Sequence, residues 1–155
     1  MVCFRPLRFQ KKRSIRLQHP GIRQQMNSAN FCLDTHPLVW YFTGQKTLSR
    51  KAKQIIDEVF AGKNQCFISV IVLLELFHLS LKVRKFSFPQ LFKTLQLFNI
   101  VIVPLDKVVL SSCFALPKDL DIHDRIIAST SKVNDCILIT KDKTLLNVQF
   151  LKTVW

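Results

Sequence analysis

Five short apolar runs, separated by segments with helical character, most strongly limit the folds available to this chain. We expect strands at NFCLD, QCFIS, NIVIVPL, CILIT and LKTVW. These runs do not alternate between apolar and polar residues, so both faces of each strand should be buried. Strands of this kind that alternate with helices are typical of a parallel sheet with helices on both faces. The sequence therefore predicts an α/β fold with a mainly parallel central sheet.

Helix boundary signals support this alternation. The segment TLSRKAKQIIDEVFAG has Ser49 as a possible N-cap and Gly62 where the helix should stop. In HPLVWYF, Pro37 lies in the first turn, where proline is well tolerated. Ser69 is a possible N-cap for VIVLLELFHLSLKV. Further helices are expected at SFPQLFKTLQLF, KVVLSSCFAL and IHDRIIASTSKV.

The positive charge is unevenly distributed. The net charge is +13 over 155 residues, and residues 1–25 contain seven Lys and Arg but no acid. We expect residues 1–25 to be a basic extension, either disordered or an over-called start, and residues 26–155 to form one domain. A basic domain suits a polyanionic partner such as RNA or DNA.

The cysteines and the hydropathy indicate the setting of the protein. The five cysteines are widely spaced and form no C-x-x-C pair, which argues against a zinc site or a thiol redox motif. Free thiols within apolar runs are expected to pack as small hydrophobic groups, which suggests a reducing, cytoplasmic location. No apolar run reaches the roughly 18 residues of a membrane span, so we expect no membrane contact.

Four acids lie at or just beyond the carboxyl ends of the expected strands. They are Asp34, Glu75, Asp124 and Asp142. In an open parallel α/β sheet, ligands bind outside these strand ends, so the four carboxylates should face one edge. Clustered anions repel one another unless a cation joins them, and oxygen ligands favour Mg²⁺ or Mn²⁺. We expect Glu75 to face the other three acids, with all their oxygens within a few ångströms of one another.

Each acid also has an ordinary explanation. Glu75 could belong to a polar stripe with His78 and Lys82, which follow it at helical spacing. Asp124 could be a first-turn acid favoured by the helix dipole, and Asp142 a turn residue. Asp121, three residues before Asp124, could approach the metal or lie in a solvated loop. These ordinary explanations account for each acid singly, but they do not explain why all four acids fall at one edge of the sheet.

Other chemistries have little support in the sequence. With three glycines the chain has no Gly-rich phosphate-binding loop. Its four histidines could in principle cleave RNA without a metal, but they share no pattern. No Ser or Cys has an evident base beside it.

The sequence resembles the PIN-domain ribonucleases, and more closely the VapC-type toxins of bacterial toxin–antitoxin pairs. The resemblance covers about residues 29–155 and is carried by LDTHPLVWYF, ISVIVLLEL, DIHDRIIAST, LITKDKTLL and the terminal Trp155. It implies a three-layer α/β/α sandwich and Mg²⁺- or Mn²⁺-dependent endonucleolytic cleavage of RNA, commonly transfer or ribosomal RNA. It also implies a homodimer that a cognate antitoxin inhibits by lying across the acidic groove.

The resemblance also implies roles for individual residues. The acidic quartet of the family corresponds to the four acids named above, and Asp121 matches an additional acid. Two supporting hydroxyl positions correspond to Thr140 and Ser69. Basic side chains are expected to hold RNA phosphates at the rim, among them Arg50, Lys53, Arg125 and Lys141.

Two features of the sequence differ from the family pattern, and two alternative functions remain open. The basic residues 1–25 have no counterpart in the family, and Ser129 and Ser131 stand where alanine is commoner. A housekeeping RNA-processing PIN nuclease and a non-catalytic PIN-like module that binds RNA or protein are the alternatives to a toxin.

Overall fold

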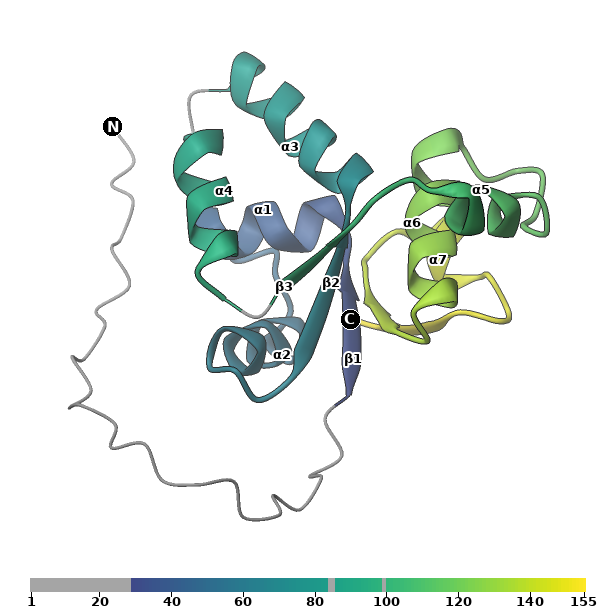
Figure 1. The fold of residues 1–155 in the computed structure, drawn as a ribbon. Helices are drawn as coiled ribbons and strands as arrows, with labels where there is room; N and C mark the ends of the chain where they lie inside the picture. The colour runs from purple at the N-terminus through teal and green to yellow at the C-terminus, as the bar shows by residue number, and fades with distance from the viewer. Residues whose placement is uncertain (1–28, 84–85, 99) are drawn as a thin grey trace, which may run out of the picture.

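The computed structural model describes residues 29–83, 86–98 and 100–155 (Figure 1). The basic extension expected at residues 1–25 lies outside the described residues. The strands are β1 Asn30–Leu33, β2 Gln65–Ser69, β3 Ile100–Val103, β4 Ile137–Ile139 and β5 Lys152–Val154. The helices are α1 Thr35–Thr43, α2 Arg50–Phe60, α3 Val70–Lys82, α4 Phe88–Gln96, α5 Lys107–Cys113, α6 Ile122–Val133 and α7 Lys143–Leu146.

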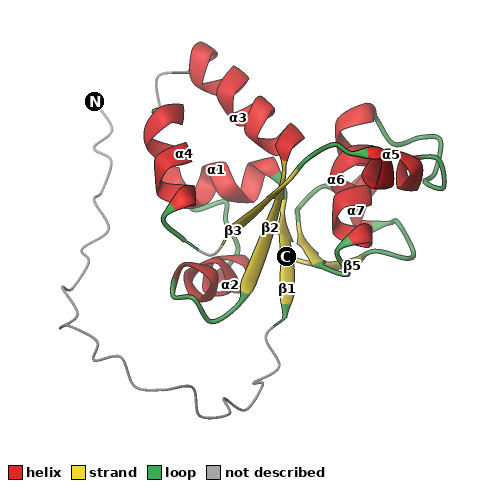
Figure 2. Cartoon of the chain, viewed as in Figure 1, coloured by secondary structure: helices red, strands yellow, loops and turns green. Residues whose placement is uncertain are grey.

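The strands form one parallel sheet in the order β3-β2-β1-β4-β5. Helices α1 to α4 lie on one side of this sheet and α5 to α7 on the other (Figure 1, Figure 2). The expected three-layer α/β/α sandwich with a parallel sheet is therefore confirmed. The strand order reverses at β1, which places the ends of β1 and β4 next to each other at the carboxyl edge.

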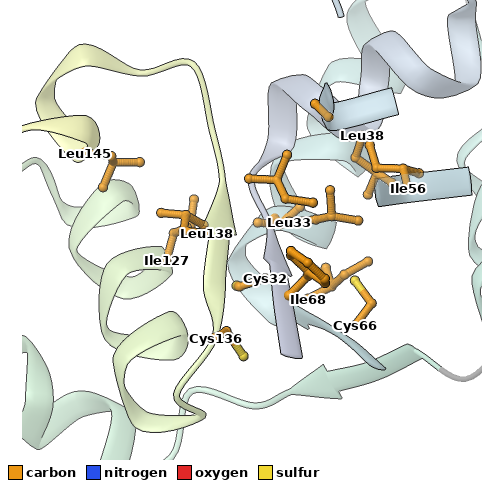
Figure 3. Packing of buried hydrophobic residues seen from close by; sticks show 14 of the residues in the cluster. Cys32, Leu33, Leu38, Ile56, Cys66, Ile68, Ile127, Cys136, Leu138 and Leu145 are labelled. Atoms are coloured by element: carbon orange, nitrogen blue, oxygen red, sulfur yellow. The ribbon is translucent and has the colours of Figure 1, made fainter. Parts of the chain in front are cut away.

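The core fills both faces of the sheet, which explains why the strands are apolar on both sides. In Figure 3, Leu38 and Ile56 come from helices on one face, and Ile127 and Leu145 from helices on the other. Leu33, at the end of β1, is fully buried. Burial of a side chain of this size stabilises a fold by roughly 1.5–3 kcal/mol, so these residues fix the sheet between its two helical layers.

The cysteines of the described region are free and buried, as predicted for Cys32, Cys66 and Cys136. Cys32 and Cys66 lie in the neighbouring strands β1 and β2, and Cys136 directly precedes β4 on the other side of β1 (Figure 3). Burial raises the pKa of the Cys32 and Cys66 thiols, and it raises that of Cys136 to about 12. They act as small apolar groups and not as nucleophiles, which need the thiolate form.

The helix boundaries follow the signals in the sequence with one exception. The Ser49 hydroxyl caps α2 by accepting a hydrogen bond from the Ala52 amide at 3.0 Å, and Gly62 follows the helix with a φ of +73°. Ser69 is the N-cap residue of α3, but its buried side chain makes no capping hydrogen bond. The short helix α7 was not predicted, because four residues are too few for a periodic pattern. No described helix is long and apolar enough to cross a membrane.

Candidate active site

The first acid follows β1 directly and is almost completely buried. Asp34 is 4% exposed and is the N-cap of α1, where its Oδ1 accepts a hydrogen bond from the Thr35 amide at 2.6 Å. Its Oδ2 accepts one from the Thr140 hydroxyl at 2.7 Å. Burial raises the pKa of Asp34, because loss of hydration outweighs these two hydrogen bonds to the charged form.

Thr140 connects the first acid to the fourth. Its hydroxyl donates to Asp34 and accepts a hydrogen bond from the Asp142 amide at 3.0 Å. The side chain is fully buried beside β1, since β4 and β1 are paired. The hydroxyl expected at this position therefore holds the ends of two neighbouring strands in a fixed arrangement.

Asp142 lies at the N-terminus of α7. Its Oδ1 accepts hydrogen bonds from the Thr144 amide at 2.7 Å and the Leu145 amide at 3.4 Å. These bonds fix one carboxylate oxygen, and no hydrogen bond to the described residues involves the other. Asp142 is therefore a capping residue of a turn, as one interpretation predicted, and its Oδ2 is still available for a ligand.

Glu75 projects from the middle of α3 toward two other helices. Its Oε2 accepts a hydrogen bond from the Thr35 hydroxyl, and its Oε1 lies 2.6 Å from Nδ1 of His123. Its side chain is 24% exposed, whereas His78 and Lys82 are exposed. The polar-stripe interpretation therefore describes His78 and Lys82, but Glu75 contacts residues at the starts of α1 and α6.

Asp124 is surrounded by other carboxylates. It lies in the first turn of α6, and its amide donates a hydrogen bond of 2.9 Å to Asp121, the N-cap of that helix. Burial raises the pKa of Asp124 to about 6, and Asp121, Asp142, Asp34 and Glu75 add to this shift in that order. Five acids from different parts of the chain therefore act on one another at this edge of the sheet.

The site includes two polar residues that the sequence did not reveal as partners of Glu75. Thr35 follows Asp34 directly, and His123 precedes Asp124 directly. Each is adjacent to an acid, which is the signal that could have identified them. No spacing rule indicates which hydroxyl or imidazole reaches across to another helix, because that depends on how α1, α3 and α6 pack.

Arg125 has a different role from the RNA contact expected of it. Its Nη1 donates to the carbonyl oxygens of Cys113 at 3.0 Å and Leu116 at 3.1 Å, and its Nη2 donates to those of Pro117 and Leu120. The guanidinium group thus fixes the segment between α5 and α6. Its two Nη groups are occupied by backbone carbonyls, so in this structure it is a positioning residue for the start of α6.

The other basic residues differ in their positions. Lys53 forms an ion pair of 2.6 Å with Asp57 and lies beside Tyr41, near the end of α1 that is farther from Asp34. Arg50 is exposed at the start of the same helix as Lys53. Lys141 is exposed and directly precedes Asp142, so it is adjacent to the acids.

The donor set suits a hard divalent cation, but the carboxylates do not converge as closely as expected. Among the described residues, no group of three or more His, Cys, Asp or Glu side chains forms a ready-made metal site. Asp34, Glu75 and Asp142 each accept hydrogen bonds from neighbouring groups, and carboxylates without a cation repel one another. The chemistry still fits Mg²⁺ or Mn²⁺, since Asp124 and the free oxygen of Asp142 are unpaired carboxylate ligands.

The sequence model of the PIN domain family matches residues 31–151. The chain belongs to the PIN domain family. The match covers β1 from its second residue, all of β2 to β4 and all seven helices, and it includes each acid described above. The chain has no match among curated proteins.

Several solved structures share the fold of this chain at low sequence identity. VapBC2 of Rickettsia felis, solved with a DNA fragment from its promoter, is 18% identical with a TM-score of 0.61, covering 81% of this chain and 97% of that one. A toxin–antitoxin complex of Klebsiella pneumoniae is 23% identical with a TM-score of 0.62, covering 81% and 96%. A domain of unknown function from Methanocaldococcus jannaschii is 15% identical with a TM-score of 0.51, covering 83% and 91%.

Proposed function

We propose that this protein is a divalent-metal-dependent endoribonuclease and the toxin of a toxin–antitoxin pair. The observation that supports this proposal is the gathering of acids at the carboxyl edge of the sheet, where Thr140 joins Asp34 to the Asp142 amide and Glu75 contacts the residues next to Asp34 and Asp124. The raised pKa of Asp124 agrees with this arrangement, since clustered carboxylates repel one another unless a cation joins them. Membership of the PIN family and the likeness to toxin–antitoxin structures support the same function.

Asp34, Asp124 and Asp142 are the residues that we expect to hold Mg²⁺ or Mn²⁺, with Asp121 as a further candidate. A divalent cation would neutralise charge on a phosphodiester and activate water for hydrolysis. Thr140 keeps Asp34 and the Asp142 backbone in register. Glu75 accepts from the Thr35 hydroxyl and pairs with His123, so we assign it to orienting the site and not to direct binding.

An apolar face of α3 supports an antitoxin partner. Leu74, Phe77 and Leu81 share one side of the helix and are 55%, 45% and 68% exposed, and Phe77 contacts Phe88 at the start of α4 at 5.4 Å between ring centres. Adjacent apolar side chains on a surface indicate a binding site.

Replacing Phe77 by Asp should weaken capture of a small protein encoded beside this one and leave RNA cleavage unchanged. Unchanged capture would refute this placement. A homodimer and a cytoplasmic location stay predictions.

The proposed activity can be tested with purified protein and structured RNA in Mg²⁺ or Mn²⁺, followed by addition of EDTA. We expect cleavage that EDTA stops and that Asp124→Asn abolishes. Asp119→Asn is the matched control, because Asp119 is exposed and makes no hydrogen bond through its side chain to the described residues. Its cleavage rate should equal that of the wild type.

The outcomes separate the proposed toxin from the alternatives. RNA binding without cleavage under every metal condition would refute the nuclease and favour a non-catalytic module. Metal-dependent cleavage by a protein with no antitoxin encoded beside it would favour a housekeeping nuclease. The class of RNA, transfer or ribosomal, can be read from the cleaved products.

A further inference from the structure

Two tryptophans and a lysine form a cluster at the carboxyl edge of the sheet. Trp40 on α1 and Trp155 after β5 have ring centres 5.5 Å apart, with their planes at 70°. His36 lies on the same helix, with its ring centre 5.5 Å from that of Trp40. Both indole groups are partly exposed, so part of each ring surface is not packed against the core.

The sheet register places this cluster next to the acids. Ile139 of β4 pairs with Val154 of β5, and the Thr140 amide donates to the Val154 carbonyl at 3.2 Å. Trp155 therefore follows β5 at the edge where Asp142 follows β4. On the other side, Asp34 is the N-cap of α1, and this helix carries His36 and Trp40 in its first two turns.

Lys141 lies over both tryptophan rings. Its Nζ is 5.7 Å from the ring centre of Trp40 and 5.9 Å from that of Trp155, which is within the range of a cation–π interaction. No carboxylate of the described residues lies within ion-pair distance of this ammonium group. The lysine is thus held one residue from Asp142 with its charge available to an anion.

Aromatic rings combined with cations beside a nuclease site suit single-stranded RNA. Unpaired bases stack on aromatic side chains, and lysine binds the phosphates between them. We propose that an unpaired base of the RNA stacks on the exposed part of the Trp40–Trp155 pair while Lys141 moves from the ring faces to an adjacent phosphate. This inference rests on the proposed function, since it assumes that RNA is the substrate.

Tryptophan fluorescence can test this inference directly, because the sequence contains two tryptophans and both belong to the cluster. The protein is titrated in EDTA with a single-stranded RNA oligonucleotide, with the duplex of the same sequence, and with polyphosphate, which has no bases. We expect the single strand to quench the fluorescence most strongly. Polyphosphate should bind without comparable quenching, because it cannot stack.

Variants separate stacking from charge and from folding. Trp155→Leu should weaken binding of the single strand about tenfold, and Trp155→Phe should restore most of it, because a base also stacks on phenylalanine. Lys141→Gln should weaken binding, whereas Lys132→Gln should not. Lys132 is the matched control, since it is also exposed and lies over an aromatic ring, 4.6 Å from the centre of Phe150, but in the last turn of α6. Circular dichroism confirms that each variant is folded.

The fluorescence and cleavage assays fail independently. RNA binding without a change in tryptophan fluorescence, equal quenching by polyphosphate, or equal effects of the two lysine variants would each overturn the stacking inference. Absence of RNA binding would also overturn it. Cleavage without quenching would leave the nuclease proposal intact, and quenching without cleavage would refute only the nuclease.

Discussion

Replacing Asp124 by Asn is expected to stabilise the protein in the absence of metal, although it should abolish cleavage. The pKa of Asp124 is raised from its ordinary value of 3.8 to about 6, because burial and four carboxylates disfavour its charged form. The ionised side chain therefore costs folding free energy at neutral pH. Asparagine has nearly the same shape without the charge, so it removes this cost.

The size of the effect follows from the pKa. Each pKa unit corresponds to about 1.4 kcal/mol, so the rise from 3.8 to about 6 sets a ceiling of about 3 kcal/mol. Asp124 is only partly buried, and solvent screening weakens interactions of exposed charges. We therefore expect Asp124→Asn to raise the free energy of unfolding by about 1–2 kcal/mol at pH 7.5, with the screening discount applied.

The pH dependence of the free energy of unfolding is a second test of whether Asp124→Asn stabilises the protein. Well below the ordinary pKa of 3.8 the carboxyl group is protonated in both the folded and the unfolded protein, so it costs no folding free energy, and at pH 4 the cost is already small. Between about pH 4 and pH 6 the folded state binds more protons than the unfolded state, and stability contributed by this group falls as the pH rises. The difference in free energy of unfolding between Asp124→Asn and the wild type should therefore grow across this pH range and reach its full value above it.

Urea denaturation in EDTA at pH 7.5 and pH 4 measures these values, with Asp119→Asn as the control for loss of one exposed negative charge. Added Mg²⁺ should reduce the difference at pH 7.5, because a ligand that binds the wild-type fold stabilises it. The reasoning is refuted if Asp124→Asn is no more stable than Asp119→Asn at pH 7.5, or if its advantage is unchanged at pH 4.

Three further variants test the hydrogen bonds around the site, and urea denaturation measures each. Arg125→Ala should lower the free energy of unfolding by about 2–4 kcal/mol, because it leaves backbone carbonyls unpaired, and a loss under 0.5 kcal/mol would contradict this role. Thr140→Val should lower the free energy of unfolding by about 2 kcal/mol, because the Thr140 hydroxyl makes two hydrogen bonds. The control Thr130→Val should lower it by less, because the buried Thr130 hydroxyl donates one bond within its own helix. Equal losses would be inconsistent with the bridging role of Thr140. Glu75→Ala should cost about 1–3 kcal/mol, whereas an ordinary surface glutamate would change stability by less than about 0.5.

The fold could be predicted largely because its signals are local. Runs such as QCFIS are short and apolar on both sides, which in this chain is compatible only with a covered parallel strand. Ser49 and Gly62 mark the ends of α2 by side-chain chemistry and backbone conformation. The helix α7 was missed because the Asp142 side chain and the turn that it caps define it, and its four residues carry no periodicity.

The site could be predicted only in part, because its contacts are set by packing. The expectation of a parallel sheet is enough to place Asp34 and Asp142 at one edge, because each directly follows a strand. It does not indicate that the Arg125 guanidinium donates hydrogen bonds to carbonyls of the preceding segment. It also does not indicate how far apart the carboxylates lie, since that distance reflects repulsion balanced against individual hydrogen bonds.

Glu75 shows how this balance works at one residue. Its position in an apolar helix suggested either a polar stripe or a metal ligand, and both interpretations assumed that the carboxylate was otherwise unpaired. Thr35 and His123 supply its partners instead, and each is adjacent in sequence to another acid of the site. The glutamate thus links the starts of α1 and α6, which carry Asp34 and Asp124. Because these two helices come from opposite faces of the sheet, a charged bond of this kind can fix the separation of two acids that would otherwise move apart.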